Sequence, residues 1–346
     1  MEQRGIDALV VTTGSDLPYL IGYKAMENER ITALVMSAEG DPILIVPALE
    51  EPRVASGIET RAWEETEDPI GIIAGVIGVP APRVAIGNQT WATFLLGLQE
   101  RLPTTRFESA EPLMSELRMV KDTDEVAALR AAGAGVDGVV GRLASTKFSG
   151  QTERQLSRRI DEMTIDSGHE RVGFAIVASG PNGASPHHEP TDRLIEAGDA
   201  VVVDFGGWMA GYASDSTRMF IVGEPPDGFI EAYAVLEAAQ RSAVDAVKPG
   251  VTAESIDAAA RDVISDAGYR DLFIHRTGHG IGLDTHERPY IVPGNTIPLV
   301  PGMTFSIEPG IYSPGQWGMR IEDIVAVTDE GVERLNTSDR GLYVVD

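Results

Sequence analysis

DAVVVDFGGWMAGYASDSTRMFIV, residues 199–222, has the pattern of two apolar β-strands joined by a tight turn. A turn centred between Met209 and Ala210 would place Asp204 and Asp215 directly opposite each other on one face of the hairpin. Their Cβ atoms would then lie roughly 4.5–5.5 Å apart, a spacing at which two like charges destabilise a sheet. A divalent cation between the carboxylates would remove that cost. Two solvated aspartates beside an ordinary hairpin turn are the alternative.

Three downstream segments supply further side chains of the kind that bind metals. RTGHGIGLDTHERPYI holds His279 in a glycine-flanked turn, and MTFSIEPGIY reads as an alternating strand that ends at Glu308. WGMRIEDIVAV reads as another strand, in which Glu322 and Asp323 must point to opposite faces. Only one of these two neighbours can therefore join an inward-facing site.

The candidate ligands form an oxygen-rich set of four carboxylates and one imidazole: Asp204, Asp215, His279, Glu308 and Glu322. Such a set favours Mn²⁺, Co²⁺ or Fe²⁺ over the Cys/His sets of structural zinc. Four carboxylates also carry more negative charge than one divalent ion needs, which predicts two bridged metals about 3.5–4 Å apart. We expect Mn²⁺, with Co²⁺, Fe²⁺ or Zn²⁺ as alternatives.

The order and contexts of these residues resemble the pita-bread metallopeptidases, the relatives of methionine aminopeptidase, aminopeptidase P and prolidase. The matching pattern is an aspartate, ten residues, a second aspartate, a histidine in a GHG turn, and glutamates in SIEPG and RIED. The resemblance covers essentially the whole chain and is most specific from about Gly173 to Val327. It implies a creatinase-like α/β N-terminal domain at 1–112 and an α+β pita-bread catalytic domain at 113–346.

The resemblance also implies roles for residues near the ligands. His187, in the segment SGPNGASPHHEP, matches the substrate-side histidine of the family. His275 and His286 match two further active-site histidines of the proline-specific branch, and Arg320 and Tyr312 stand where that branch has them. His188 stands where many relatives have another residue and is expected to be structural.

In the implied mechanism the ligands divide between two ions, with Asp204 on one, His279 and Glu308 on the other, and Asp215 and Glu322 shared. A water between the metals would become the nucleophile near neutral pH. Glu308 would carry its proton to the leaving imino nitrogen. His187 and His286 would donate hydrogen bonds to the scissile carbonyl or its oxyanion.

The resemblance to the proline-specific branch favours an Xaa-Pro dipeptidase (prolidase) acting on small peptides with proline at the second position. A dipeptidase must bind a free carboxylate, and Arg320 is the best cation for it in the catalytic domain, unless it merely pairs with Glu322. An aminopeptidase P acting on longer peptides is the first alternative. Methionine aminopeptidases need no such N-terminal domain, and creatinase-like amidinohydrolases lack the metal ligands. A lyase or a binding module on the same fold is the remaining alternative.

Composition limits the partners and the location of the protein. A chain of 346 residues suits two domains, and its net charge of −25 argues against nucleic acid and anionic membranes. The absence of cysteine excludes disulfides and thiolate ligands. No apolar run approaches the ~20 residues of a membrane helix, and the first residues lack a signal-peptide layout. We therefore expect a cytoplasmic protein, and the family resemblance implies a homodimer.

Local patterns predict the elements of both domains. IDALVVT, ITALVMS, PILIVP and RVAIG predict strands of the first domain, and residues 48–57 and 90–102 predict helices between them. Asp122 with Glu125, and Thr152 with Gln155, have the spacing of capping boxes that begin helices of the second domain.

Overall fold

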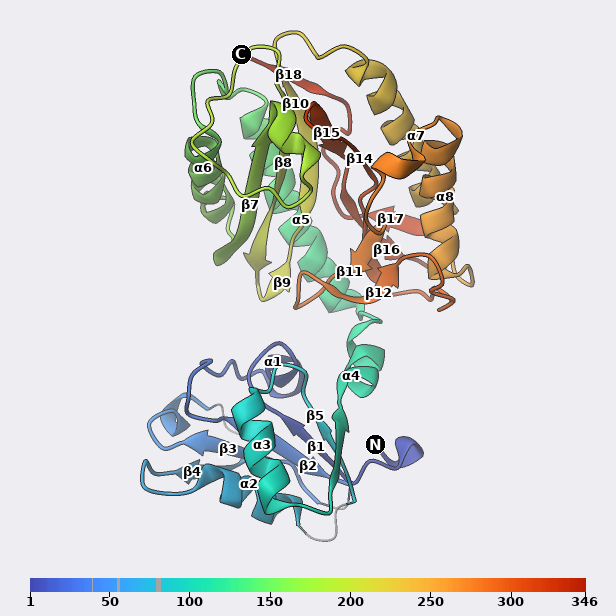
Figure 1. The fold of residues 1–346 in the computed structure, drawn as a ribbon. Coiled ribbons are helices and arrows are strands. Elements are labelled where there is room, and N and C mark those ends of the chain that lie inside the picture. Colours follow the sequence, from blue (N-terminus) through green and yellow to red (C-terminus); the bar gives the residue numbers. More distant parts are fainter. Residues whose placement is uncertain (39, 55–56, 79–81) are drawn as a thin grey trace. The chain divides into compact units, whose positions relative to one another are not determined.

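The chain folds into two compact units, Met1–Leu117 and Arg118–Asp346. The computed structural model describes residues 1–38, 40–54, 57–78 and 82–346 (Figure 1). The sequence analysis placed the domain division between residues 112 and 113, near the start of α4 (Glu111–Arg118). Among the described residues, no helix combines the length and the apolar character needed to cross a membrane.

The first unit is built on a mixed six-stranded sheet in the order β4-β3-β2-β1-β5-β6. Neighbours among β1, β2 and β3 are antiparallel, and the other pairs are parallel. One face packs against α2 (Pro69–Ile77) and α3 (Ala92–Arg101), and the other against α1 (Asp16–Ile21) and α4. The strands are β1 (Ala8–Val11), β2 (Ala33–Ser37), β3 (Ile43–Pro47), β4 (Glu59–Trp63), β5 (Arg83–Ile86) and β6 (Arg106–Ser109).

One predicted helix of this unit is wrong. In the described part of residues 48–57 the chain forms a single 3-10 turn, η2 (Glu51–Arg53), and residues 55–56 lie outside the described chain. Val54 ends the turn with an extended backbone, φ −73° and ψ 126°. A β-branched residue favours that conformation over a helical one, so the run does not propagate.

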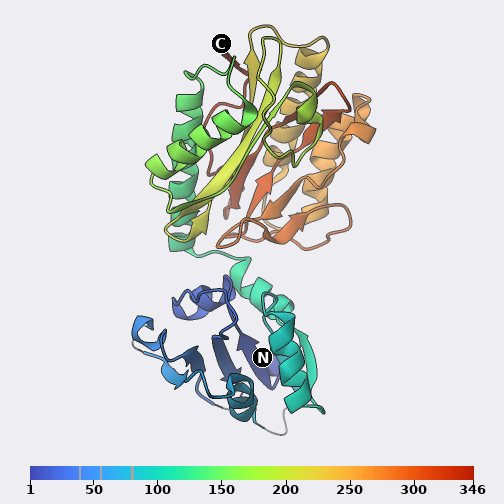
Figure 2. The same cartoon turned by 60° about the vertical axis from the view of Figure 1, so that its left-hand side comes forward.

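The second unit has two halves, and each contributes two helices followed by strands (Figures 1 and 2). The strand pairs are antiparallel, except that the last strand of the chain pairs in parallel with a strand of the first half. The first half has α5 (Thr123–Leu143), α6 (Glu153–Asp166), β7 (Arg171–Ser179), β8 (Ala200–Met209), β9 (Tyr212–Ala213) and β10 (Ser216–Val222). The second has α7 (Phe229–Ala246), α8 (Ala253–Asp266), β11 (Gly278–Gly280), β12 (Glu287–Ile291), β13 (Thr304–Ile307), β14 (Gly310–Ser313), β15 (Trp317–Arg320), β16 (Asp323–Val327), β17 (Val332–Arg334) and β18 (Tyr343–Val345). Both predicted capping boxes are present, at the starts of α5 and α6.

Alternation along β8 turns one face of that strand toward the site. Val201, Val203 and Phe205 pack in the core beneath α5 and α6. Val202 therefore faces the other way, into the core shared with the second half, and Asp204 shares its face. The predicted α/β domain followed by an α+β domain is thus confirmed.

The hairpin register differs from the predicted one. Thr217, not Asp215, lies opposite Asp204, so the prediction that the two aspartates are direct cross-strand partners is wrong. The turn is centred on Ala210 and Gly211, whose φ angles are 50° and 80°. Glycine tolerates this left-handed backbone, so Gly211 favours the shifted centre. Asp215 lies between β9 and β10, two residues from Thr217 and so on the same face as Asp204.

Candidate active site

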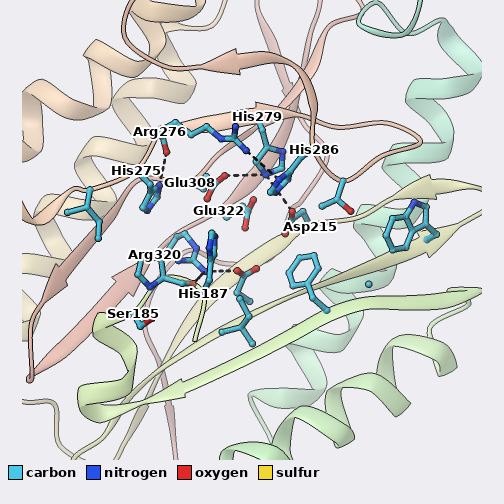
Figure 3. Close-up of a pocket in the computed structure, with 18 residues that line it drawn as sticks. Ser185, His187, Asp215, His275, Arg276, His279, His286, Glu308, Arg320 and Glu322 are labelled. Atoms are coloured by element: carbon cyan, nitrogen blue, oxygen red, sulfur yellow. Dashed lines mark hydrogen bonds and ion pairs between the residues drawn. The ribbon is translucent and has the colours of Figure 1, made fainter. Parts of the chain in front are cut away.

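Strands and strand junctions of the second unit bring the five predicted metal ligands together. Figure 3 shows four of them, Asp215, His279, Glu308 and Glu322, around the pocket. Asp204 comes from β8, Asp215 from the β9–β10 junction and His279 from β11. Glu308 directly follows β13, and Glu322 lies between β15 and β16. All are buried except Glu308, which is partly exposed toward the pocket. Segments more than 100 residues apart in the sequence thus meet at one point.

The ligands fall into two overlapping groups. In one, Asp204, Asp215 and Glu322 offer oxygens that all lie within 4.8 Å of one another. In the other, a ring nitrogen of His279 and carboxylate oxygens of Glu308 and Glu322 all lie within the same distance of one another. Glu322 belongs to both groups, as a ligand shared between two ions would. His286 also lies within this range of Asp215 and His279.

Unsatisfied oxygens show that the ligand set fits cations. Among the described residues, one oxygen each of Asp204, Asp215 and Glu322 is buried without a hydrogen-bond partner. A buried polar atom left in this way costs about 1–3 kcal/mol, more if charged. Divalent cations would satisfy these oxygens, and carboxylates with one imidazole suit Mn²⁺-like ions.

The electrostatics of the cluster support the same conclusion. Burial raises the pKa of Asp215 well above its usual value, and the charges of Glu322 and Asp204 raise it further. Burial and the charges of Glu308 and Asp204 likewise raise the pKa of Glu322. Burial alone would raise the pKa of Glu308, but the hydrogen bond with His279 and the charges of His279, His275 and Arg320 together outweigh burial and lower the pKa to about 2. Without a cation, these carboxylates cannot all be ionised together near neutral pH.

A buried ion pair fixes the start of β16, directly after Glu322. Arg218 donates to Asp323 Oδ1 at 2.6 Å and to the main-chain oxygen of Glu322 at 2.6 Å. Thr217 Oγ1 donates to Glu322 Oε2 at 2.8 Å. Asp323 thus faces Arg218 while Glu322 faces the site, as the strand pattern predicted.

Arg320 lines the pocket but is held mainly by protein oxygens. It is 3% exposed and donates to Asp204 Oδ2, Thr217 Oγ1, Tyr312 Oη and the oxygen of Pro186. Its acidic partner is therefore Asp204, not Glu322 as one interpretation of the sequence had it. Within the described chain these bonds engage four of its five N–H groups.

The predicted histidines surround the same pocket in different environments. His275 Nε2 lies 2.9 Å from Tyr312 Oη, and its Nδ1 lies 2.7 Å from the main-chain oxygen of Arg276. Both ring nitrogens are thus engaged, which suits a residue that supports the loop. His187 lies in the loop after η3 (Gly180–Ala184), with its side chain exposed to the pocket.

His286 packs on a predicted ligand, with ring centroids 3.9 Å from those of His279. Loss of water, together with the charges of His279 and Arg276, lowers the pKa of His286 to about 4. The neighbouring Glu287 forms ion pairs with Arg118 and the buried Lys121, which anchor this segment.

The pocket has a volume of about 770 Å³, and sequence reasoning missed part of its lining. The missed residues Phe174 and Ile176 add apolar surface. Trp208, a tryptophan beside the hairpin turn, adds more, and it is fixed by a hydrogen bond to Leu283 O and by Arg171 over its ring. The alternation in RVGFAIVAS was a signal for the first two, because Phe174 and Ile176 share a face. Arg276, Ile274 and Thr285 line the pocket as well.

Comparison with known proteins agrees with this geometry. Residues 127–329 match Metallopeptidase family M24, and residues 1–120 match the Creatinase/Prolidase N-terminal domain. The probable dipeptidase PepE of Mycobacterium tuberculosis is 46% identical over 348 residues, which cover 99% of this chain and 92% of that protein. The Xaa-Pro dipeptidase of Lactobacillus helveticus is 35% identical over 353 residues, covering 98% and 95%.

A solved structure extends the similarity to three dimensions. The prolidase of Thermococcus sibiricus is 40% identical and superposes with a TM-score of 0.95, covering 99% of this chain and 96% of that one. Sequence motifs, fold and ligand cluster therefore agree. This chain belongs to metallopeptidase family M24 and carries that family's creatinase/prolidase type of N-terminal domain.

Proposed function

We propose that this protein hydrolyses Xaa-Pro dipeptides at a centre of two divalent metal ions, with Mn²⁺ as the preferred ion. The observation that carries the proposal is the cluster of buried, partly unsatisfied carboxylates facing a pocket of about 770 Å³. A pocket of that size suits a small ligand. The similar proteins named Xaa-Pro dipeptidase and prolidase support the substrate class.

Five residues would hold the ions: Asp204, Asp215, His279, Glu308 and Glu322. Bound divalent ions supply Lewis-acid polarisation of the scissile carbonyl and lower the pKa of a water molecule. Glu308 is ionised near neutral pH, since its pKa is about 2. Its carboxylate is the proposed acceptor of the proton that the attacking water would lose. It would deliver this proton to the proline nitrogen as the peptide bond breaks.

Two histidines would stabilise the charge that develops on the carbonyl oxygen. His286, with a pKa of about 4, is neutral near pH 7 and carries one N–H donor. His187 reaches the pocket from the opposite half of the catalytic domain. Hydrogen bonds aimed at the oxyanion accelerate the reaction because they strengthen in the transition state. His275 was predicted as a further active-site histidine; because both of its ring nitrogens are engaged by protein atoms, we assign it the support of this wall of the pocket.

Recognition of the substrate would rest on its ring and its carboxylate. An Xaa-Pro amide has no N–H to donate, so the site must recognise other groups. The apolar side chains of Phe174, Ile176 and Trp208 offer surface for the substrate's apolar parts. Arg320 lines the pocket and is the proposed partner of the free carboxylate.

The test compares Ala-Pro with Ala-Pro-Ala at saturating Mn²⁺. The dipeptidase proposal expects faster cleavage of Ala-Pro, measured as kcat/KM. Equal or faster cleavage of the longer peptide would identify an aminopeptidase P with the same metal chemistry. Cleavage of neither peptide would favour a non-peptidase member of the fold.

The family resemblance also supports a homodimer in which the N-terminal domain of one chain lies near the catalytic pocket of its partner. Light scattering at micromolar concentration should then give twice the chain mass of 37.0 kDa. A monomer that retains full activity would refute this arrangement.

A further inference from the structure

A buried carboxylate lies beneath the loop that carries His187. Glu153 is the first residue of α6, and its side chain is completely buried, with a relative exposure of 0%. It is not one of the candidate metal ligands, and it does not line the pocket. A buried acidic side chain away from the reacting groups needs a physical reason, because ionised carboxylates are costly to remove from water.

Six hydrogen bonds engage both oxygens of Glu153. Oε1 accepts from the main-chain nitrogen of Ser179 at 2.8 Å, from Ser179 Oγ at 2.8 Å and from Asn182 Nδ2 at 2.9 Å. Oε2 accepts from His188 Nε2 at 2.8 Å, from the main-chain nitrogen of Thr191 at 3.0 Å and from Thr191 Oγ1 at 2.7 Å. One carboxylate therefore joins the end of β7, the 3-10 turn and the returning loop.

The groups that donate to Glu153 require a hydrogen-bond acceptor at each of its two oxygens. Two of them are main-chain N–H groups, those of Ser179 and Thr191, which cannot turn into acceptors. Burial raises the pKa of Glu153, but the hydrogen bonds from Ser179, Asn182, His188 and Thr191 outweigh it and bring the pKa to about 2. The group is thus ionised, and the start of α6 adds a favourable helix dipole.

The anchored points enclose His187 on both sides. Asn182 lies five residues before it, His188 directly follows it, and Thr191 lies four residues after it. In the described chain the His187 imidazole itself makes no hydrogen bond to protein, so its backbone sets where the ring lies. Two main-chain bonds, Ser185 N to Asn182 O and His188 N to Ser185 O, complete the turn that leads to it.

We propose that Glu153 is a positioning residue for the hydrolytic reaction: its buried carboxylate fixes the loop that aims His187 at the substrate. This inference rests on the proposed role of His187. Glu153 is neither among the candidate ligands nor in the pocket lining, so it would act through the loop. Its loss displaces the His187 imidazole, and a displacement of about 1 Å costs roughly 10²-fold in rate. That loss lies within the 10²–10³-fold expected for removing one oxyanion donor outright.

The decisive experiment is a double-mutant cycle on the metal-loaded enzyme, with kcat for Ala-Pro as the readout. Glu153→Gln alone should lower kcat roughly 10²-fold, with metal content unchanged and KM changed much less, because the lost contact matters in the transition state. In a His187→Ala background the same substitution should have almost no further effect, since the group it positions is gone.

Conservative variants separate positioning from packing. Gln matches Glu in shape but turns one acceptor into a donor that faces N–H groups, whereas Asp keeps both acceptors on a shorter side chain. Glu153→Asp should therefore retain more activity than Glu153→Gln. If Glu153 mattered only for packing, the opposite order would be expected, because glutamine is closer to glutamate in size. If Glu153→Gln does not fold, His188→Ala can take its place in the double-mutant cycle. It removes only one of the hydrogen bonds to Glu153, from a half-buried side chain, and should perturb the loop less. Glu189→Gln, at an exposed position of the same loop, is the matched control and should leave kcat unchanged.

The outcomes distinguish the two proposals. A full effect of Glu153→Gln in both backgrounds, or none in either, would overturn the positioning role. If the glutamine variant is unfolded, the same test applies to His188→Ala: an equal loss of kcat in the wild-type and His187→Ala backgrounds would overturn the positioning role. If His187→Ala itself leaves kcat intact, the proposed function of His187 fails, whatever Glu153 does.

Discussion

Thr217 offers a sharp test of how the protein holds its metal ligands. This fully buried residue lies opposite Asp204 in the sheet. Its hydroxyl donates to Glu322 Oε2 at 2.8 Å and accepts from Arg320 Nε at 3.1 Å. Thr217→Val keeps the shape of the side chain and removes both hydrogen bonds.

Two separate losses follow from that substitution. The Nε–H of Arg320 remains buried without an acceptor, which should lower the free energy of unfolding of the metal-free protein by about 1–3 kcal/mol. Glu322 loses the partner that orients it toward the ions, and the loss of such a partner typically weakens metal binding about 10–100-fold. We therefore expect the Kd for Mn²⁺ to rise by that factor while the fold is retained.

Calorimetric titration of the metal-free protein with Mn²⁺ measures the affinity, and urea unfolding measures the stability. Thr217→Ser is the control, because it restores the hydroxyl and removes only a methyl group. An unchanged Kd in Thr217→Val would refute the reasoning. An equal loss in Thr217→Ser would show that packing, not the hydroxyl, holds Glu322.

Three further predictions concern the loop that carries His187. His187→Ala should retain bound metal and lose on the order of 10²–10³ in kcat, measured on Ala-Pro with metal analysis of the same sample. Gly318→Ala would place a Cβ 1.8 Å from the main-chain oxygen of Gly183, in the turn η3 that precedes this loop, and should lower the free energy of unfolding in urea by about 1–3 kcal/mol. The control is Gly138→Ala, at a position on α5 with open space around it, which should instead raise the free energy of unfolding by up to about 1 kcal/mol. The folded-state pKa of Glu153 is about 2 against a usual 4.5, so its stabilisation is present above pH 4.5 and is lost as the pH falls through about 2. The difference in free energy of unfolding between wild type and Glu153→Gln should therefore become smaller as the pH falls from 4.5 to about 2. A difference that stays constant over this range would contradict the prediction.

Much of the site could be predicted from the sequence because its residues lie in short motifs with strong local signals. His279 between two glycines, Glu308 before a proline and Glu322 in an alternating strand each have a recognisable context. The structure brings all three to one cluster. Local capping chemistry likewise predicted the starts of α5 and α6 correctly.

The errors arose where a local pattern leaves several geometries open. An alternating hairpin is compatible with more than one register, and only the preference of Gly211 for a left-handed backbone distinguishes the observed turn. The predicted helix at residues 48–57 depended on polar residues whose helical pattern is weak. Glu153 was not singled out from the sequence, because nothing local indicates that Ser179, His188 and Thr191 converge on it.

Metal dependence tests the central claim most directly. The protein is stripped of metal and titrated with Mn²⁺, and bound ions and Ala-Pro hydrolysis are measured on the same samples. We predict no hydrolysis without metal, and full activity as binding approaches about two ions per chain, as expected for a two-metal site. Asp215→Ala, which removes a ligand of the shared cluster, should abolish this activity. Full hydrolysis of Ala-Pro by the metal-free protein, or at saturating Mn²⁺ with only one ion bound, would contradict the account.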